Sequence, residues 1–147
     1  MSLSAKPRNL LRDLTHDERV ELARAIMNML DDWKIGNDDR VVLLDLPPET
    51  KGRSMRRYSE NTPFPDSGET YARIEHLLGI ADALRTSFPR SAEAGAIWMQ
   101  RRNGRFDNRS PLRVMLDEGM GGIVHIRTHL DCAYDWHISG SAVTPTG

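Results

Sequence analysis

Apolar residues recur at helical spacing in three separate segments of this 147-residue chain, and proline or glycine lies between these segments. Residues three and four positions apart share one face of an α-helix, so each apolar stripe predicts a helix that buries that face. The stripes occupy residues 17–33, 69–88 and 123–134. We therefore expect helices over most of the chain, with connections at the prolines and glycines.

The first stripe begins after Asp17 and ends before Gly36, which breaks the helix. Its members are Val20, Ala23, Ile26, Met27, Leu30 and Trp33. Asn37 can cap the segment that follows. The next apolar run, Val41–Leu44, is continuous, so periodicity alone permits either a buried strand or a helix there.

A proline pair, Pro47-Pro48, precedes a short basic segment, where we expect a helix that ends near Tyr58 or Ser59. Glu49 would lie in its first turn, where a carboxylate complements the helix dipole. The densest basic cluster of the chain lies here, and its candidate DNA-binding residues are Lys51, Arg53, Ser54, Arg56, Arg57 and Tyr58. Such a surface could neutralise phosphates and reach base edges in a major groove. The alternative is a solvated basic face, and Gly52 weakens the helix.

Residues 61–68 contain two prolines and form the expected connector between the two halves of the chain. Asp66 and Glu69 have the spacing of a capping box at the start of the second stripe. That stripe consists of Tyr71, Ile74, Leu77, Leu78, Ala81, Leu84 and Phe88. Ser91 then caps a further helix that runs towards Trp98.

The segment from Trp98 to Leu130 contains the residues of a recognition loop and few that could do chemistry. Asn103 and Asn108 tolerate left-handed backbone, and a loop between them can present Phe106 and Arg109 outward on a rigid frame. Five arginines straddle this loop: Arg101, Arg102, Arg105, Arg109 and Arg113. Arginine forks around an aromatic anchor are typical of a protein interface, and the alternative is a solvated face.

A short helix should follow the loop, because Ser110 can cap it and Pro111 suits its first position. Gly119 would end it. The GMGG sequence at 119–122 precedes a helix, as a phosphate loop does, but it lacks the preceding strand and the lysine. We favour a helix stop and a flexible corner there. The last apolar stripe consists of Ile123, Ile126, Leu130, Ala133 and Tyr134.

The chain resembles the toxin-binding domain of the MbcA/ParS/Xre antitoxin family. The matching residues are Trp98, Asn103, Phe106, Arg109-Ser110-Pro111-Leu112, Gly119 and the helix through Val124 and Leu130. The resemblance extends upstream through IEHLLGIADALRTSFP and through MLDDWKIGNDDRVVLLDLPPETKGRSMRRY, which looks like that family's Xre-type helix-turn-helix. It favours a helix over Val41–Leu44. The family usually has glycine where Asn108 stands.

The resemblance implies an all-α fold, with a helix-turn-helix-like N-terminal half and a small helical C-terminal toxin-binding domain. We expect the helix-turn-helix region at residues 15–62, the toxin-binding domain at 66–138 and flexible tails at 1–14 and 139–147. The protein would be a type II antitoxin that occludes a cognate toxin, often a RES-domain toxin that consumes NAD. Its N-terminal half would form a homodimer and bind operator DNA.

The toxin-binding residues that the resemblance implies are Asn103, Phe106, Arg109, Ser110, Pro111 and Leu112. Arg109 would anchor an acidic or nucleotide-recognising group of the toxin. The final helix would help to cover the entrance of the toxin's active site. Such an antitoxin would need no cofactor.

Composition narrows the classes of protein further. The formal net charge is −1, so binding of DNA must depend on a local patch. Cys132 is the sole cysteine, which excludes an intramolecular disulfide. The start of the chain lacks the apolar core of a signal peptide, and the apolar runs are too short for a membrane span. We therefore expect a cytoplasmic protein.

Evidence for an enzyme is weak. His125, His129, Cys132 and Trp136 share one face of the last helix, and two histidines four apart can ligate zinc, but no glutamate follows His125 as in a zinc protease. No nucleophile elbow, phosphate loop or dinucleotide turn is present. We favour a half-buried interface face and a protein without metal or catalytic activity. The alternatives are a stand-alone DNA-binding regulator whose C-terminal half only dimerises, and a small metal-dependent enzyme.

Overall fold

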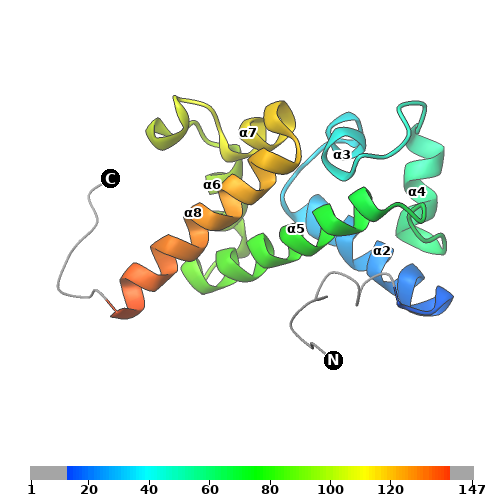
Figure 1. Cartoon of the computed structure of the whole chain (residues 1–147), viewed down its shortest axis with the longest axis horizontal. Coiled ribbons are helices and arrows are strands. Elements are labelled where there is room, and N and C mark those ends of the chain that lie inside the picture. The colour runs from blue at the N-terminus through cyan, green and yellow to red at the C-terminus, as the bar shows by residue number, and fades with distance from the viewer. Residues whose placement is uncertain (1–12, 140–147) are drawn as a thin grey trace. The chain divides into compact units, whose positions relative to one another are not determined.

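The structure, a computed structural model, describes residues 13–139, and of residues 92 and 133–139 it describes the backbone alone. Its elements in order (Figure 1) are α2 (His16–Asp32), α3 (Asn37–Leu44), α4 (Gly52–Glu60), α5 (Gly68–Ser87), α6 (Ala92–Gln100), the 3-10 helix η2 (Gly104–Phe106), α7 (Pro111–Glu118) and α8 (Met120–Ser139). The described residues contain no strand, only one isolated bridge between Asn103 and Arg109. The predicted all-α fold is confirmed. Residues 1–12 and 140–147 of the predicted tails lie outside the described residues.

Contacts divide the described residues into two compact units, and the division falls between Glu75 and His76. The division falls inside α5, so this helix contributes its first turns to the first unit and the remainder to the second. The predicted domains of residues 15–62 and 66–138 remain a prediction. No helix within residues 13–139 is long and apolar enough to cross a membrane.

In the first unit, α2 begins as its sequence requires. Thr15 accepts a hydrogen bond from the Glu18 amide, and the Glu18 carboxylate accepts one from the Thr15 amide, which completes a capping box. The predicted apolar stripe is buried, and α2 packs against α4. Met55 and Tyr58 supply the buried face of α4. The apolar stripe predicted for α2 is therefore confirmed.

The run Val41–Leu44 is helical and forms the end of α3. Leu43 and Leu44 are buried whereas Val42 is half exposed, so the helix is amphipathic over only eight residues. That length is too short for periodicity to separate a helix from a strand. The residue at the cap position is Gly36, not Asn37, which is already helical.

The basic helix α4 starts later than predicted. A turn closed by a hydrogen bond from the Thr50 amide to the Pro47 carbonyl at 2.9 Å precedes it. Glu49 therefore lies in this turn and not in the first turn of α4, and Lys51 occupies the cap position without a side-chain capping bond. The helix ends at Glu60, one residue beyond the predicted range.

The start of α5 fixes this helix to the end of α3. Ser67 precedes the first residue of α5, and its hydroxyl caps the helix by accepting from the Thr70 amide at 3.2 Å. The cap predicted at Asp66 is therefore wrong by one position, and Asp66 pairs with Arg19 at 3.4 Å. The buried Thr70 hydroxyl donates to the Leu44 carbonyl at 2.9 Å. Such bonds satisfy carbonyls that a helix end leaves without partners.

The second unit comprises the end of α5 with α6, η2, α7 and α8. α7 packs against both α6 and α8. The buried apolar residues of the second unit are Leu77, Ile80, Ala83, Leu84, Ala96, Met99, Phe106, Leu112, Val114, Met115, Ile123, Ile126 and Leu130. From the predicted stripe of α5, Leu78, Ala81 and Phe88 are only half buried.

Gly119 ends α7 with a positive φ of 62°, as predicted. The expected flexible corner at Gly121-Gly122 is wrong, because α8 begins at Met120 and includes both glycines. Gly122 is buried where α8 approaches α7, and an added methyl group would overlap the Val114 carbonyl oxygen. Glycine is therefore required here for close helix packing and not for chain flexibility.

Candidate functional site

The loop after α6 is closed by its own hydrogen bonds. The Asn103 side chain accepts from the Arg105 amide at 2.9 Å, and the Asn103 carbonyl accepts from the Asn108 amide at 3.0 Å. Asp107 and Asn108 have positive φ angles of 58° and 64°, whereas Asn103 is extended at −139°. Left-handed backbone thus occurs at Asn108, as its residue type permits, and at Asp107, which sequence reasoning missed. The loop is a fixed frame.

Phe106 points into the protein and is 3% exposed. Its ring lies edge to face with His125 and His129, at centroid distances of 5.4 and 5.1 Å, and 6.5 Å from Trp98. The expectation that Phe106 projects outward is wrong, because η2 turns this side chain onto the imidazoles of α8. The Phe106 ring therefore packs the loop against α8. Each such aromatic contact stabilises the fold by about 0.5–1.5 kcal/mol beyond the effect of burial.

His129 is half buried between the loop and α6. It stacks on Trp98 at a centroid distance of 6.2 Å. Burial lowers the pKa of His129, and the positive charge of Arg105 and the neighbouring His125 lower it further. The neutral imidazole is thus the form that this packing favours.

Arg109 joins the loop to the end of α7. Its guanidinium donates to the Glu118 carboxylate at 2.7 Å and to the Phe106 carbonyl at 3.3 Å, and it lies 3.6 Å from Asp117. The hydrogen bond with Glu118 raises the pKa of Arg109. Arg113 shares Asp117 at 3.6 Å. Arg109 therefore forms ion pairs with two carboxylates of its own chain, Asp117 and Glu118.

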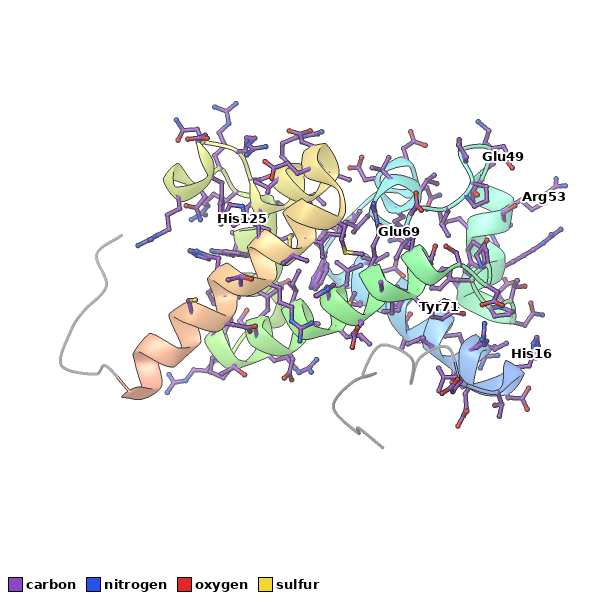
Figure 2. All side chains as sticks on the ribbon, viewed as in Figure 1. His16, Glu49, Arg53, Glu69, Tyr71 and His125 are labelled. Carbon is purple, nitrogen blue, oxygen red and sulfur yellow. The ribbon has the colours of Figure 1, made fainter. Side chains whose placement is uncertain are left out.

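The other predicted toxin-binding residues also build the frame. The Ser110 hydroxyl caps α7 by accepting from the Arg113 amide at 3.0 Å, as predicted. Pro111 and Leu112 are buried. The side chains that this frame exposes are mainly basic and polar, namely Arg101, Arg102, Arg105, Asp107 and Asn108. His125 and Val124 of α8 are also exposed, and Figure 2 labels His125 on that helix.

On α4 the structure exposes most of the predicted DNA-binding residues. Lys51, Arg53, Arg56 and Arg57 are exposed and Ser54 is half buried. Figure 2 shows Arg53 extending away from the helix. Tyr58 is instead 9% exposed, with its ring 4.8 Å from that of Phe64, and burial raises its pKa. Among the described side chains, no carboxylate lies within ion-pair distance of the three arginines of α4.

Sequence reasoning missed Arg40, a charged residue that is only 7% exposed. Its Nε donates to the Ile35 carbonyl at 2.8 Å, and its Nη2 pairs with Asp31. The signal was present, since Arg40 lies three and four positions before the buried Leu43 and Leu44. Arg40 also lines an open pocket of about 180 Å³ between α2, α3 and α4.

The histidines of α8 do not gather a metal site in the described part of the chain. Where side chains are described, no three residues among His, Cys, Asp and Glu are grouped so that they could hold an ion. His125 and Cys132 are exposed. The side chain of Trp136, which the sequence placed on the same face, lies outside the described residues.

Residues 83–133 match the family model of the antitoxin Xre/MbcA/ParS C-terminal toxin-binding domain. The matched segment runs from the end of α5 through α6, the capped loop and α7 into α8. No curated protein and no solved structure matches the chain. The match includes the loop frame described above, and over these residues the chain is similar to the toxin-binding domain of the Xre/MbcA/ParS antitoxins.

Proposed function

We propose that the second unit binds a cognate toxin and blocks it by covering the entrance of its active site. The toxin would be a RES-domain protein that consumes NAD, and the antitoxin would act without a cofactor or catalysis of its own. The observation that carries this proposal is the family match over residues 83–133, which contains the whole capped loop.

The loop frame supports binding because it is ordered before the partner arrives. Two caps, the Asn103–Arg109 bridge and the Arg109–Glu118 pair fix its backbone. A surface that is already fixed loses less conformational entropy on association. The six predicted toxin-binding residues would then act mostly by holding this surface in place.

Direct contact with the toxin would come from the exposed side chains on the frame. Arg101, Arg102 and Arg105 are exposed beside the loop. Arginine is enriched at the energetic centres of protein interfaces, and its planar fork suits carboxylates. An acidic rim on the toxin is the surface that these residues fit.

We further propose that the first unit binds operator DNA, as a homodimer, and thereby regulates its own operon. The support is the basic face of α4, where Arg53, Arg56 and Arg57 are exposed without an acidic neighbour at ion-pair distance among the described residues. The second candidate is a stand-alone regulator that uses the same face and whose C-terminal half only dimerises.

The test is co-expression of the full chain with the product of its neighbouring gene, followed by growth and co-purification. The charge reversal Arg102→Glu/Arg105→Glu should reduce rescue of growth, whereas Arg53→Glu/Arg57→Glu should leave rescue intact and abolish binding to upstream DNA. If the neighbour is harmless when expressed alone and does not co-purify, the antitoxin proposal fails and the regulator remains.

A further inference from the structure

The pocket of the first unit has the composition of an anion site. Seven residues from three helices line it: Met27, Asn37, Arg40, Gly52, Met55, Arg56 and Ser59. Two of them are arginines, and none is acidic. Its volume of about 180 Å³ far exceeds the roughly 10–15 Å³ that one water needs. A small charged group can therefore enter.

Arg40 is the buried, fixed cation that lines this pocket. Its guanidinium is more than nine-tenths buried and fixed by the Ile35 carbonyl and Asp31. A guanidinium has five N–H donors, and these two bonds leave donors to spare. A charge held in low-dielectric surroundings attracts an anion more strongly than a solvated one does. Asp31 is 61% exposed and is not among the lining residues, so it offsets this charge only in part.

The α4 side of the pocket adds a second cation and neutral hydrogen-bonding groups. Gly52, Arg56 and Ser59 follow one another along one side of α4, and the Asn37 amide lies against its first turn. The amide and the hydroxyl can donate to oxyanion oxygens without adding negative charge. Arginine with such neutral donors is a set suited to phosphate.

We propose that this pocket binds a phosphate group of the DNA backbone. The inference rests on the proposed DNA binding of α4, and it identifies the place beside that helix where the protein would contact the DNA backbone. Arg56 belongs both to the pocket and to the exposed basic face with Arg53 and Arg57. A phosphate held there sets the position of α4 along the groove, because phosphate contacts fix the orientation of a protein on the duplex.

The first experiment titrates inorganic phosphate into the full-length protein at constant ionic strength, with chloride as the reference anion, and follows backbone amide NMR signals. Shifts at Gly52 and Ser59 with phosphate alone are expected. Ser59→Leu fills the pocket from an exposed position without changing charge and should abolish these shifts. Arg56→Gln should weaken them, whereas Arg85→Gln, which removes one charge from an exposed site on α5, should not. Equal shifts with chloride, or none in wild type, overturn the proposal.

The second experiment identifies the source of the phosphate. Binding to the duplex upstream of the chain's own gene is measured over a range of salt. Loss of one phosphate contact should reduce the slope of log K against log salt by about 0.9 in Ser59→Leu. If phosphate binds but Ser59→Leu leaves the DNA slope unchanged, the assignment to DNA is overturned. If wild type binds phosphate but no DNA, the proposed operator binding fails while the phosphate pocket stands.

Discussion

Gly121 and Gly122 are neighbours in α8, yet alanine at the two positions should change the stability of the second unit in opposite directions. A methyl group on Gly122 would overlap the Val114 carbonyl oxygen and lie 3.0 Å from the Glu118 Cβ. A methyl group on Gly121 meets no atom within 4 Å. Both glycines are helical and neither has a positive φ.

The expected size follows from these contacts. Overpacking a well-packed site costs about 1–3 kcal/mol, and we place Gly122→Ala at about 2.5 kcal/mol because the obstacle is backbone of another helix. At either position, replacing glycine by alanine also stabilises the folded state by about 0.5 kcal/mol, because alanine restricts the conformations of the unfolded chain. The net expectation is a loss of about 2 kcal/mol for Gly122→Ala and a gain of about 0.5 kcal/mol for Gly121→Ala.

Thermal unfolding of the full chain, followed by circular dichroism, measures the difference. For a unit of this size each 1 kcal/mol moves the Tm by about 4–8 °C, so Gly122→Ala should lower it by about 8–16 °C. Gly121→Ala should raise it slightly. Gly122→Ala should also weaken neutralisation of the toxin, since a shift of α7 moves Glu118 and with it the loop. A Tm that rises equally in both variants would refute the close approach of α7 and α8.

Three further perturbations test the loop frame. Phe106→Ala should lower the free energy of unfolding by about 3–5 kcal/mol in urea, whereas Ile97→Ala, at a side chain 51% exposed, should change it by less than about 0.5 kcal/mol. Glu118→Gln should release Arg109 and raise amide hydrogen exchange in the loop. Because the pKa of His129 is lowered from 6.5 in the folded state, stability should fall as the pH drops below about 6.5, and His129→Gln should reduce that fall.

Each of these has an outcome that contradicts it. An unchanged urea midpoint in Phe106→Ala means that the ring is at the surface. Identical exchange rates in Glu118→Gln mean that the caps alone hold the loop. A fall in stability at low pH that is as steep in His129→Gln as in wild type assigns the effect to other titrating groups.

The helices could be predicted from sequence where their periodicity is long and could not where it is short. The apolar stripe of α2 spans several turns, and the residues predicted from it to be buried lie in the core. The eight residues of α3 gave no such signal. The caps at Ser91 and Ser110 were predicted because a cap is a local interaction between residues three apart.

The loop shows what sequence does not contain. Arg109 was expected to reach outward, but Glu118, nine residues later, lies beside it only because α7 folds back. Phe106 is covered by histidines about twenty residues further along the chain. Residue types and spacing do not specify such neighbours, whereas the left-handed backbone at Asn108 depends on the residue itself.

The residues that carry the family resemblance are therefore mostly those that build the frame. Asn103 caps η2 and Ser110 caps α7. Phe106 and Leu112 are buried, and Arg109 forms an ion pair with Glu118. None of these roles requires a particular partner. If the proposed toxin contact is made by the exposed arginines beside the frame, substitutions there should change which toxin is bound while stability stays nearly constant. The frame and the specificity of this domain would then be separable by mutation.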